Sequence, residues 1–443
     1  MDKTFYIETY GCQMNFADSE ILSAILTSAS YTPCSHYRQA DVILINTCSI
    51  RDHAEQRIYN RLREFVAYKK VKPRLKIGII GCMAERLKED LLSSQIAVDL
   101  VVGPDAYRSL PRLLQEVESG AQGIDVLLSE EETYHDISPV RLGPNKISAF
   151  VSIMRGCENY CAYCVVPYTR GKERSRDPQS IIEEARQLFH EGYREITLLG
   201  QNVNSYNCES TTFPLLMEAV AQISPLLRVR FSTSHPKDLS DDLLKTMVKY
   251  PNICKAIHLP VQSGSSRMLK QMKRKYDRIW YLDRIASIRK HIPDCGLSTD
   301  IITGFCGETL TDHQETLSLM REVGYDFAFM FKYSERPNTL AARSYIDDVA
   351  EEEKLRRLNE VIDQQQVLSF ESNKKDVGKD FEILVEGISK KSKTHYFGRS
   401  SQNKVIVFEN SQEKPVHIGD YAYIHITQCT AATLLGSLIE INR

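Results

Sequence analysis

Three cysteines lie close together in the segment 155–171, RGCENYCAYCVVPYTRG. Cys157, Cys161 and Cys164 have the spacing C-x3-C-x2-C, and Tyr163 stands directly before the last of them. A structural zinc site is closed by four ligands, whereas this loop offers three cysteines and no flanking histidine. Thiolates also hold [4Fe–4S] clusters, and three protein ligands leave one iron open, as in catalytic metal sites. The spacing therefore favours a catalytic iron–sulfur cluster, with zinc and a distant fourth ligand as the alternative.

Three further cysteines each follow a stretch with the composition of a strand. Cys12 comes after TFYIETYG, Cys48 ends DVILINTC, and Cys82 ends LKIGIIGC. In a parallel sheet the carboxyl ends of the strands share one edge, and ligands of open α/β sheets bind there. We therefore expect these three cysteines to converge in space. The alternative is that each is a buried apolar cysteine, the usual state of a free thiol.

The elements that must position these cysteines fall into four segments. Residues 1–121 alternate strand and helix patterns, which predicts a parallel α/β sheet. Residues 122–147 lose this periodicity and predict a linker. Residues 148–372 contain about six more β/α units, which predict a partial β/α barrel with its working face at the carboxyl ends of the strands. Residues 373–443 have short alternating strands, typical of a small antiparallel β-barrel.

The composition limits the function classes. The chain has 443 residues and is 42% hydrophobic and 26% charged, as expected for a globular protein of several domains. Its net charge of -2 gives no overall attraction to nucleic acid, so RNA binding would need local basic patches. No run approaches the ~20 apolar residues of a membrane-spanning helix, and we expect a cytoplasmic protein. Twelve cysteines in that compartment argue against a disulfide framework.

The three-cysteine loop is similar to the motif of radical S-adenosylmethionine (SAM) enzymes. The longer stretch RGCENYCAYCVVPYTRGKERSR, with TYGCQMN, NTCSIRDHA and GCMAER nearer the N-terminus, resembles the methylthiotransferase family over essentially the whole chain. The resemblance implies an N-terminal domain with an auxiliary [4Fe–4S] cluster, a radical SAM core and a C-terminal RNA-binding barrel called TRAM. It also implies that Cys12, Cys48 and Cys82 hold the auxiliary cluster. Cys157, Cys161 and Cys164 would hold the cluster that binds SAM.

Within this family, LLGQNVNSY, STSHP and GLSTDIITGF resemble the branch that modifies N6-isopentenyladenosine at position 37 of tRNA, next to the anticodon. The resemblance implies insertion of a methylthio group at C2 of that base, with SAM as both methyl donor and source of a 5′-deoxyadenosyl radical. A radical can break an aromatic C–H bond, and the cofactor carries this chemistry, so we assign no catalytic residue beyond the clusters. Alternatives are the same chemistry on threonylcarbamoyladenosine or on a ribosomal protein, and a non-catalytic iron–sulfur RNA-binding protein.

Polar residues at the predicted strand ends of the barrel are the candidate SAM contacts. Acceptors suit the ammonium group of SAM, and donors suit its carboxylate and ribose. Tyr163 would lie against the adenine. The remaining candidates are Gln201, Asn202, Ser232, Ser234, Gln262 and Asp300. For each, the alternative is an ordinary polar residue at a strand end.

Two basic segments are candidates for RNA binding, because basic side chains neutralise phosphates and aromatic rings stack on unpaired bases. The first lies in the predicted TRAM barrel and comprises Lys390, Lys391, Lys393, Tyr396, Arg399 and Lys404. The second follows the cysteine loop and comprises Arg170, Lys172, Arg174 and Arg176. The alternative for each is a solvated charge run. We expect the tRNA anticodon stem-loop, SAM and an electron-donor protein as partners of a monomer.

Overall fold

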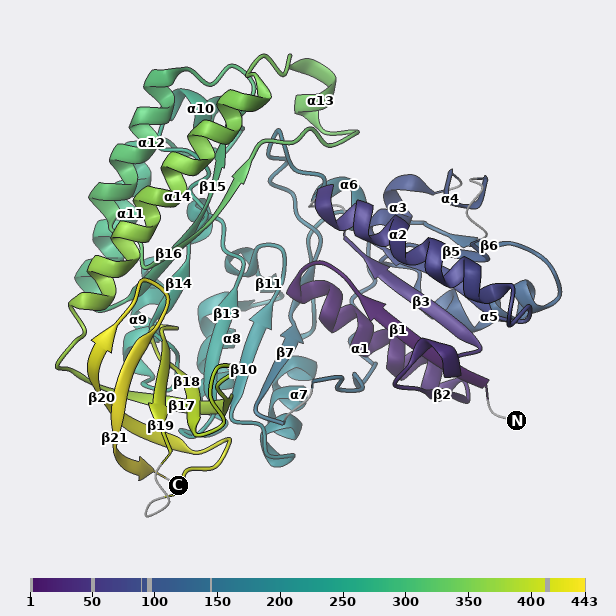
Figure 1. The fold of residues 1–443 in the computed structure, drawn as a ribbon, viewed down its shortest axis with the longest axis horizontal. Helices are drawn as coiled ribbons and strands as arrows, with labels where there is room; N and C mark the ends of the chain where they lie inside the picture. The colour runs from purple at the N-terminus through teal and green to yellow at the C-terminus, as the bar shows by residue number, and fades with distance from the viewer. Residues whose placement is uncertain are drawn as a thin grey trace.

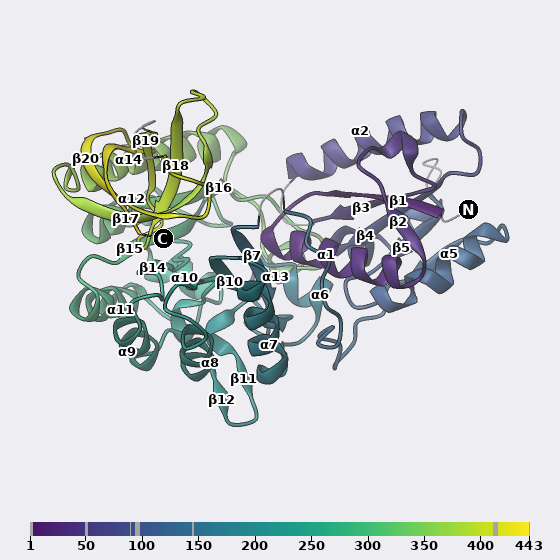
Figure 2. The same cartoon turned by 90° about the horizontal axis from the view of Figure 1, so that it is seen from below.

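The computed structural model describes residues 3–48, 52–88, 90–93, 98–143, 146–410 and 415–442. Figure 1 shows an N-terminal α/β unit on the right, a central barrel on the left and a small C-terminal barrel below it. Seen from below in Figure 2, the N-terminal unit lies beside the other two, with α1 (Gln13–Ser28) at the junction next to β7 (Ser148–Ser152). Phe16 of α1 packs edge-on against Phe150 of β7, with ring centroids 6.1 Å apart.

The N-terminal unit is built on a six-stranded parallel sheet with the order β2-β1-β3-β4-β5-β6. Its strands are β1 (Lys3–Thr9), β2 (Tyr31–Pro33), β3 (Val42–Thr47), β4 (Lys76–Gly81), β5 (Leu100–Val102) and β6 (Gly123–Asp125). Every residue of β3 is buried, as its run VILINT predicts for a central strand covered on both faces. The predicted parallel sheet is confirmed.

Helices cover both faces of this sheet. Besides α1 they are α2 (Asp52–Lys69), α3 (Cys82–Leu87), α4 (Asp90–Ser93) and α5 (Leu110–Glu118). One apolar core gathers α1 and α5 with β1, β3 and β5, and a second gathers α2 and α3 on the opposite face. Two faces with two cores are the expected result of alternating strands and helices.

The segment predicted as a linker packs against its surroundings. Its first residues form β6, which pairs with β5 at the edge of the sheet. Tyr134 is buried, and its ring stacks on that of Tyr107 with centroids 5.5 Å apart. The guanidinium of Arg155 lies 4.8 Å from the centre of the Tyr134 ring. This segment therefore joins the N-terminal unit to the strand that precedes the cysteine loop.

The central unit contains six parallel strands in two sheets, β13-β10-β7 and β14-β15-β16. A parallel bridge between Val229 and Ile253 connects the two sheets. The strands after β7 are β10 (Glu195–Leu199), β13 (Arg228–Ser232), β14 (Ala256–His258), β15 (Gly296–Thr303) and β16 (Phe327–Lys332). Two-residue strands flank them as β8 (Met154–Arg155), β9 (Arg174–Ser175), β11 (Asn207–Cys208) and β12 (Thr211–Thr212). Among the described residues no ladder joins β7 to β16, so the barrel is partial, as predicted.

The longer helices of the central unit lie outside its strands (Figure 1). They are α6 (Val166–Arg170), α7 (Pro178–His190), α8 (Phe213–Ala221), α9 (Asp241–Lys249), α10 (Ser266–Gln271), α11 (Arg278–His291), α12 (Leu310–Val323), α13 (Leu340–Ser344) and α14 (Glu351–Lys374). Several of these helices have an N-cap side chain that accepts a hydrogen bond from the first turn. Asp177 accepts from Ser180 N at the start of α7, and Asp277 accepts from Trp280 N at the start of α11. Such caps satisfy backbone donors that have no partner in the first turn of a helix.

The C-terminal unit is a closed five-stranded barrel with the order β17-β18-β19-β21-β20. The predicted small barrel is confirmed, but it is not antiparallel throughout, because β19 and β21 pair in parallel. Its strands are β17 (Asp380–Ile388), β18 (His395–Ser400), β19 (Val405–Glu409), β20 (Tyr421–Cys429) and β21 (Leu434–Asn442). Arg228 at the start of β13 donates to Arg399 O at 2.7 Å and to Glu382 Oε1 at 2.9 Å. The small barrel is therefore attached at the amino ends of the central strands, opposite their carboxyl ends.

Within the described part of the chain, no helix combines the length and the apolar character needed to cross a membrane.

Candidate active site between two cysteine trios

The first cysteine trio, Cys157, Cys161 and Cys164, lies in a loop closed at its base by the β8–β9 pair. Gly156 has a φ of +79°, and a Cβ at this position would lie 1.8 Å from Lys172 O. Only glycine allows the two ends of the loop to approach so closely. Burial raises the pKa of the Cys157 thiol to about 11 and raises that of Cys164 further, since neighbouring thiols add to the effect. A positively charged partner would favour their thiolate form.

One buried arginine approaches this trio from a distant part of the barrel. Arg274 Nη1 donates to Cys161 Sγ at 3.2 Å and to the Tyr163 hydroxyl at 3.3 Å. Its other nitrogens donate to Pro260 O at 2.8 Å and to the Tyr276 hydroxyl at 2.9 Å. Arg274 belongs to the stretch KQMKRK, which has the composition of a surface patch. The spacing of the basic residues in this stretch does not indicate that one of them contacts the cysteines.

The second trio gathers at the carboxyl edge of the N-terminal sheet. Cys12 caps α1 after β1, Cys48 follows β3, and Cys82 begins α3 after β4. The thiols of Cys12 and Cys48 are hydrogen-bond partners, an interaction that lowers the pKa of Cys12 to about 6 with help from the charge of Arg170. Gly11 has a φ of +116°, and a Cβ there would lie 2.3 Å from the Cys48 Cβ. Cys12 and Cys48 thus meet directly, and Cys82 lies at the same edge of the sheet, as expected.

Arg170, the last residue of α6, reaches this second trio from the central unit. Its Nε donates to Cys82 Sγ at 3.2 Å, and its Nη2 donates to Asn15 Oδ1 at 3.0 Å and to Asp18 Oδ2 at 2.8 Å. The same Asn15 Oδ1 accepts from Cys12 Sγ at 3.7 Å. One guanidinium therefore connects two of the three cysteines with the segment that follows the other trio.

The residues around both trios suit anionic iron–sulfur clusters, which Cys thiolates hold and hydrogen bonds to sulfur stabilise. Buried N–H donors already point at sulfur in both places: Arg170 at Cys82, Arg274 at Cys161, and Asn159 Nδ2 at Cys157 at 3.5 Å. Among the described residues no group of three or more His, Cys, Asp or Glu side chains could hold a single metal ion. A four-iron cube takes its thiolates at separate corners, so its ligands stand farther apart than those of one ion.

The candidate SAM contacts divide into two kinds. Gln201 and Gln262 each have a buried Oε1 with no hydrogen-bond partner, and Gln262 has a φ of +72°. A buried unpaired acceptor costs free energy, so these two oxygens are suited to a polar ligand. Asn202 is already engaged, since its Nδ2 donates to Asp238 Oδ2 at 2.7 Å and its Oδ1 accepts from His235 N at 3.0 Å. The structure therefore corrects the expectation that the Asn202 side chain contacts SAM. This side chain instead binds the segment of His235 and Asp238.

The remaining candidates lie at or near the strand ends. Ser234 is buried and donates to Asn204 Oδ1 at 3.2 Å, while the Asn204 Nδ2 is buried without a partner. Asp300 of β15 lies 3.3 Å from His258 Nε2, and Ser232 ends β13. Tyr163 packs edge-on against Phe305 with ring centroids 6.3 Å apart. Asn204, which lies in the stretch LLGQNVNSY, is a polar group that the sequence-based selection missed.

A row of aromatic side chains on β16 was also missed. Phe327, Phe329 and Phe331 alternate along one face of this strand and are 51%, 46% and 38% exposed. The Phe329 ring lies edge-on to the Phe327 ring at 4.9 Å and to the His258 ring at 5.8 Å. Phe329 pairs in register with Asp300. Their period of two residues was visible in the sequence, but their exposure was not.

The basic segment after the cysteine loop requires a correction. Arg170, Arg174 and Arg176 were predicted to hold phosphates, yet all three are buried. Arg174 donates to Asp105 Oδ2 at 2.8 Å and Oδ1 at 3.0 Å, and Arg176 pairs with Glu184. Their guanidinium groups thus bind protein carboxylates. Lys172 is exposed and lies 2.8 Å from Glu130, so it alone of this segment faces solvent.

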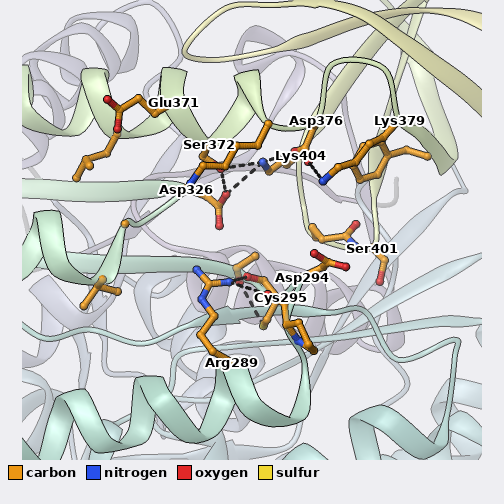
Figure 3. Close-up of a pocket in the computed structure, with 18 of the residues that line it drawn as sticks. Arg289, Asp294, Cys295, Asp326, Glu371, Ser372, Asp376, Lys379, Ser401 and Lys404 are labelled. Atoms are coloured by element: carbon orange, nitrogen blue, oxygen red, sulfur yellow. Dashed lines mark hydrogen bonds and ion pairs between the residues drawn. The ribbon is translucent and has the colours of Figure 1, made fainter.

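Lys404 requires the same correction. A cavity of about 750 Å³ lies between the central unit and the small barrel. Figure 3 shows Lys404 inside it, where its Nζ lies 2.5 Å from Asp376 Oδ2 and 3.2 Å from Asp326 Oδ1. Its charge is neutralised there, so Lys404 joins the two units and is not available to a phosphate.

The other TRAM candidates differ in their exposure and in their partners. Lys390, Lys391 and Lys393 are exposed in the turn between β17 and β18. Arg399 is partly exposed and donates to Glu386 Oε2 at 2.7 Å. Tyr396 is half-buried and packs against the core of the small barrel near Phe408. Three lysines therefore remain as the basic patch of this barrel.

Three family models match successive parts of the chain. Residues 4–103 match the family described as uncharacterized protein family UPF0004, residues 151–320 match the Radical SAM superfamily, and residues 374–439 match the TRAM domain. Together with the loop of Cys157, Cys161 and Cys164, the central match defines the class of the protein, a radical SAM enzyme.

Relatives along nearly the whole chain identify the family more closely. The tRNA-2-methylthio-N(6)-dimethylallyladenosine synthase of Phocaeicola vulgatus is 58% identical over 98% of this chain and 96% of its own length. The synthases of Bacteroides thetaiotaomicron and Porphyromonas gingivalis are 55% and 52% identical, over 98% and 99% of this chain and 96% and 95% of their own lengths. The chain belongs to this family of radical SAM methylthiotransferases.

Solved structures share the fold. A radical SAM methyltransferase from Kitasatospora setae, with tryptophan and a SAM analogue bound, has a TM-score of 0.60 at 10% identity, covering 77% of this chain and 75% of that one. A cobalamin-dependent SAM radical enzyme has a TM-score of 0.53 at 12% identity, covering 82% of this chain and 56% of that one. At such identities the likeness concerns the arrangement of the elements alone.

Proposed function

We propose that this protein is a tRNA methylthiotransferase that inserts a methylthio group at C2 of N6-isopentenyladenosine at position 37, next to the anticodon. The observation that carries the proposal is the convergence of Cys12, Cys48 and Cys82 at the sheet edge that faces the loop of the other trio, with Arg170 reaching from one to the other. Relatives at 52–58% identity carry the name of this activity. The substrate adenosine, and SAM as methyl donor and radical source, follow from that family.

The cysteines divide the cofactor binding between them. Cys157, Cys161 and Cys164 would hold one [4Fe–4S] cluster, and Cys12, Cys48 and Cys82 would hold the other. When bound, the clusters and SAM supply the radical and the sulfur chemistry that side chains cannot provide. The buried Oε1 atoms of Gln201 and Gln262 are free to accept from the ammonium or ribose of SAM.

The buried arginines balance charge at the sulfurs. A thiolate-held cluster is anionic, and a guanidinium has a pKa high enough to stay charged when buried. Arg274 beside Cys161 and Arg170 beside Cys82 therefore place a positive charge next to one sulfur of each trio. The same donors fix the orientation of the cysteine side chains before a cluster binds.

The RNA would be held at two places. The exposed lysines of the TRAM turn, Lys390, Lys391 and Lys393, would neutralise phosphates. The target base must leave its stack to reach the site, and the exposed rings of Phe327 and Phe329 offer a surface on which an unpaired base can stack. Phe329 lies beside Asp300, one of the candidate SAM contacts, so such a base would lie near the SAM site.

An anaerobic assay of the reconstituted enzyme tests the proposal. Isopentenylated anticodon stem-loop RNA should gain a methylthio group that mass spectrometry detects, whereas an unmodified stem-loop and a ribosomal protein should not. Cys12→Ala should still cleave SAM to 5′-deoxyadenosine but should form no methylthiolated RNA. Methylthiolation of the ribosomal protein or of threonylcarbamoylated RNA instead would contradict the assigned substrate.

The cell context completes the proposal. An enzyme that acts on tRNA would work in the cytoplasm, would receive electrons from a donor protein and would act as a monomer. Size-exclusion chromatography with light scattering measures the last of these directly.

A further inference from the structure

Asp18 of α1 lies at the centre of a buried ion network between the two cysteine trios. Its Oδ1 accepts from Arg155 Nη1 at 2.9 Å, and its Oδ2 accepts from Arg170 Nη2 at 2.8 Å. The side chain of Asp18 has no exposed surface, and those of Arg155 and Arg170 are 1% and 3% exposed. Ion pairs with so little exposure are screened little by salt and hold a defined geometry.

The two arginines flank the loop of the first trio. Arg155 stands two residues before Cys157, and Arg170 stands six residues after Cys164. One carboxylate of the N-terminal unit therefore holds both ends of the segment that carries the first trio. Asp18 itself belongs to the helix that Cys12 of the second trio caps.

A second carboxylate of the N-terminal unit repeats the arrangement. Asp105 accepts from Arg174 at 2.8 and 3.0 Å and lies 3.6 Å from Arg155 Nε. Arg174 pairs in register with Arg155 across the β8–β9 pair that closes the loop. Asp18 and Asp105 thus hold the base of the loop against the N-terminal unit at two points.

The network has an excess of positive charge that is directed at the second trio. Three arginines, Arg155, Arg170 and Arg174, face the two aspartates, and the Nε of Arg170 ends on Cys82 Sγ at 3.2 Å. The guanidinium that pairs with Asp18 therefore also contacts a sulfur of the second trio. The contact between the two units and the surroundings of the second trio therefore involve the same side chains.

We propose that Asp18 is a positioning residue that sets the distance and orientation between the two cysteine trios through Arg155 and Arg170. This inference rests on the proposed function, because it assumes that the two trios act on one substrate. Radical formation needs the first trio alone, whereas sulfur transfer needs both at a fixed separation. Loosening the network should therefore leave SAM cleavage intact while the product yield falls.

The test uses Asp18→Asn in the anaerobically reconstituted enzyme with both clusters loaded. Asparagine keeps the size of the side chain but replaces one carboxylate oxygen by an N–H donor, which cannot accept from an arginine. We expect methylthiolated RNA per 5′-deoxyadenosine to fall by about 10–100-fold, the cost of a misplacement near 1 Å. Electron paramagnetic resonance of the doubly reduced enzyme should also show a changed magnetic interaction between the clusters.

Asp312→Asn is the matched control. Asp312 is also buried and paired with an arginine, Arg267, but it lies at the start of α12, and its hydrogen-bond partners Ser265, Arg267 and Thr309 belong to neither trio. It should keep the wild-type product ratio and the wild-type magnetic interaction. Arg155→Lys is a second variant, which retains the positive charge and the Asp18–Arg170 pair. It should lower the yield of methylthiolated RNA per 5′-deoxyadenosine less than Asp18→Asn does.

The outcomes separate the inference from the proposed function. Wild-type enzyme that does not methylthiolate the stem-loop would contradict the function itself. Active wild type together with unchanged product ratio and magnetic interaction in loaded Asp18→Asn would overturn the positioning role. Loss of clusters from both Asp18→Asn and Arg155→Lys, with Asp312→Asn fully loaded, would overturn it as well, because the network would then serve cluster binding alone.

Discussion

Arg274 donates a hydrogen bond to Cys161 Sγ at 3.2 Å, although the two residues stand 113 positions apart in the chain. Arg170 has the same relationship to Cys82, also at 3.2 Å. Each cysteine trio therefore includes one sulfur that faces a buried guanidinium from another part of the fold. Hydrogen bonds and positive charge at the ligating sulfur are among the properties that set the potential of an iron–sulfur cluster.

Replacing Arg274 should lower the reduction potential of the cluster held by the first trio. Arg274→Gln removes a positive charge beside Cys161, so the reduced, more negative cluster loses stabilisation. We expect a shift of roughly 59 mV or more, tenfold in the equilibrium constant of a one-electron couple. A redox titration followed by electron paramagnetic resonance measures it. Lys270→Gln, an exposed change in the same segment, is the control; an equal shift there would contradict a local effect.

Replacing Phe329 should weaken substrate binding without preventing SAM cleavage. Stacking of a base on an aromatic ring contributes about 1–3 kcal/mol, so Phe329→Ala should raise the Kd of the stem-loop about tenfold. Fluorescence anisotropy with labelled RNA measures the affinity, and substrate-independent 5′-deoxyadenosine formation should stay near wild type. Phe370 on α14 is 44% exposed and serves as the control site. An unchanged Kd for Phe329→Ala would exclude a stacking role.

Replacing the three lysines of the TRAM turn should reduce the salt dependence of RNA binding. Each phosphate contact to single-stranded RNA adds about 0.7 to the slope of log K against log salt, so removing Lys390, Lys391 and Lys393 should lower it by roughly 2. Lys404→Gln should leave the slope unchanged, since Lys404 binds Asp376 and Asp326. A smaller slope for Lys404→Gln would instead show that Lys404 contacts a phosphate.

The stability contributed by Asp312 should depend on pH. Although burial opposes its charge, hydrogen bonds from Arg267, Ser265 and Thr309 hold the pKa of Asp312 well below its ordinary value. A carboxylate with a depressed pKa stabilises the fold above the unfolded value of about 3.9 and loses this contribution as the pH falls below it. Asp312→Asn should therefore lower the free energy of unfolding at pH 7 by about 1–3 kcal/mol.

Calorimetry of the wild type and Asp312→Asn between pH 7 and pH 3 measures this dependence. The difference in Tm should be constant from pH 7 to about pH 5 and should shrink below about pH 4. A difference that stays constant down to pH 3 would contradict the depressed pKa.

The sequence by itself determined the order of the elements and the two cysteine trios. Strand and helix periodicity is local, so the parallel sheet, the partial barrel and the small barrel could be predicted from it. The convergence of Cys12, Cys48 and Cys82 followed because strands of a parallel sheet end at one edge. Those inferences needed no knowledge of which distant side chains meet.

The tertiary structure alone decided what the arginines do. TRGKERSR reads as a basic patch, yet Arg170 and Arg174 pair with Asp18 and Asp105, which stand 152 and 69 positions away. Lys404 likewise pairs with Asp376 and Asp326. Whether a cation binds phosphate or protein depends on which carboxylates the fold brings within a few ångströms. Composition carries no information about such distances, because charge pairing is non-local and burial decides its strength.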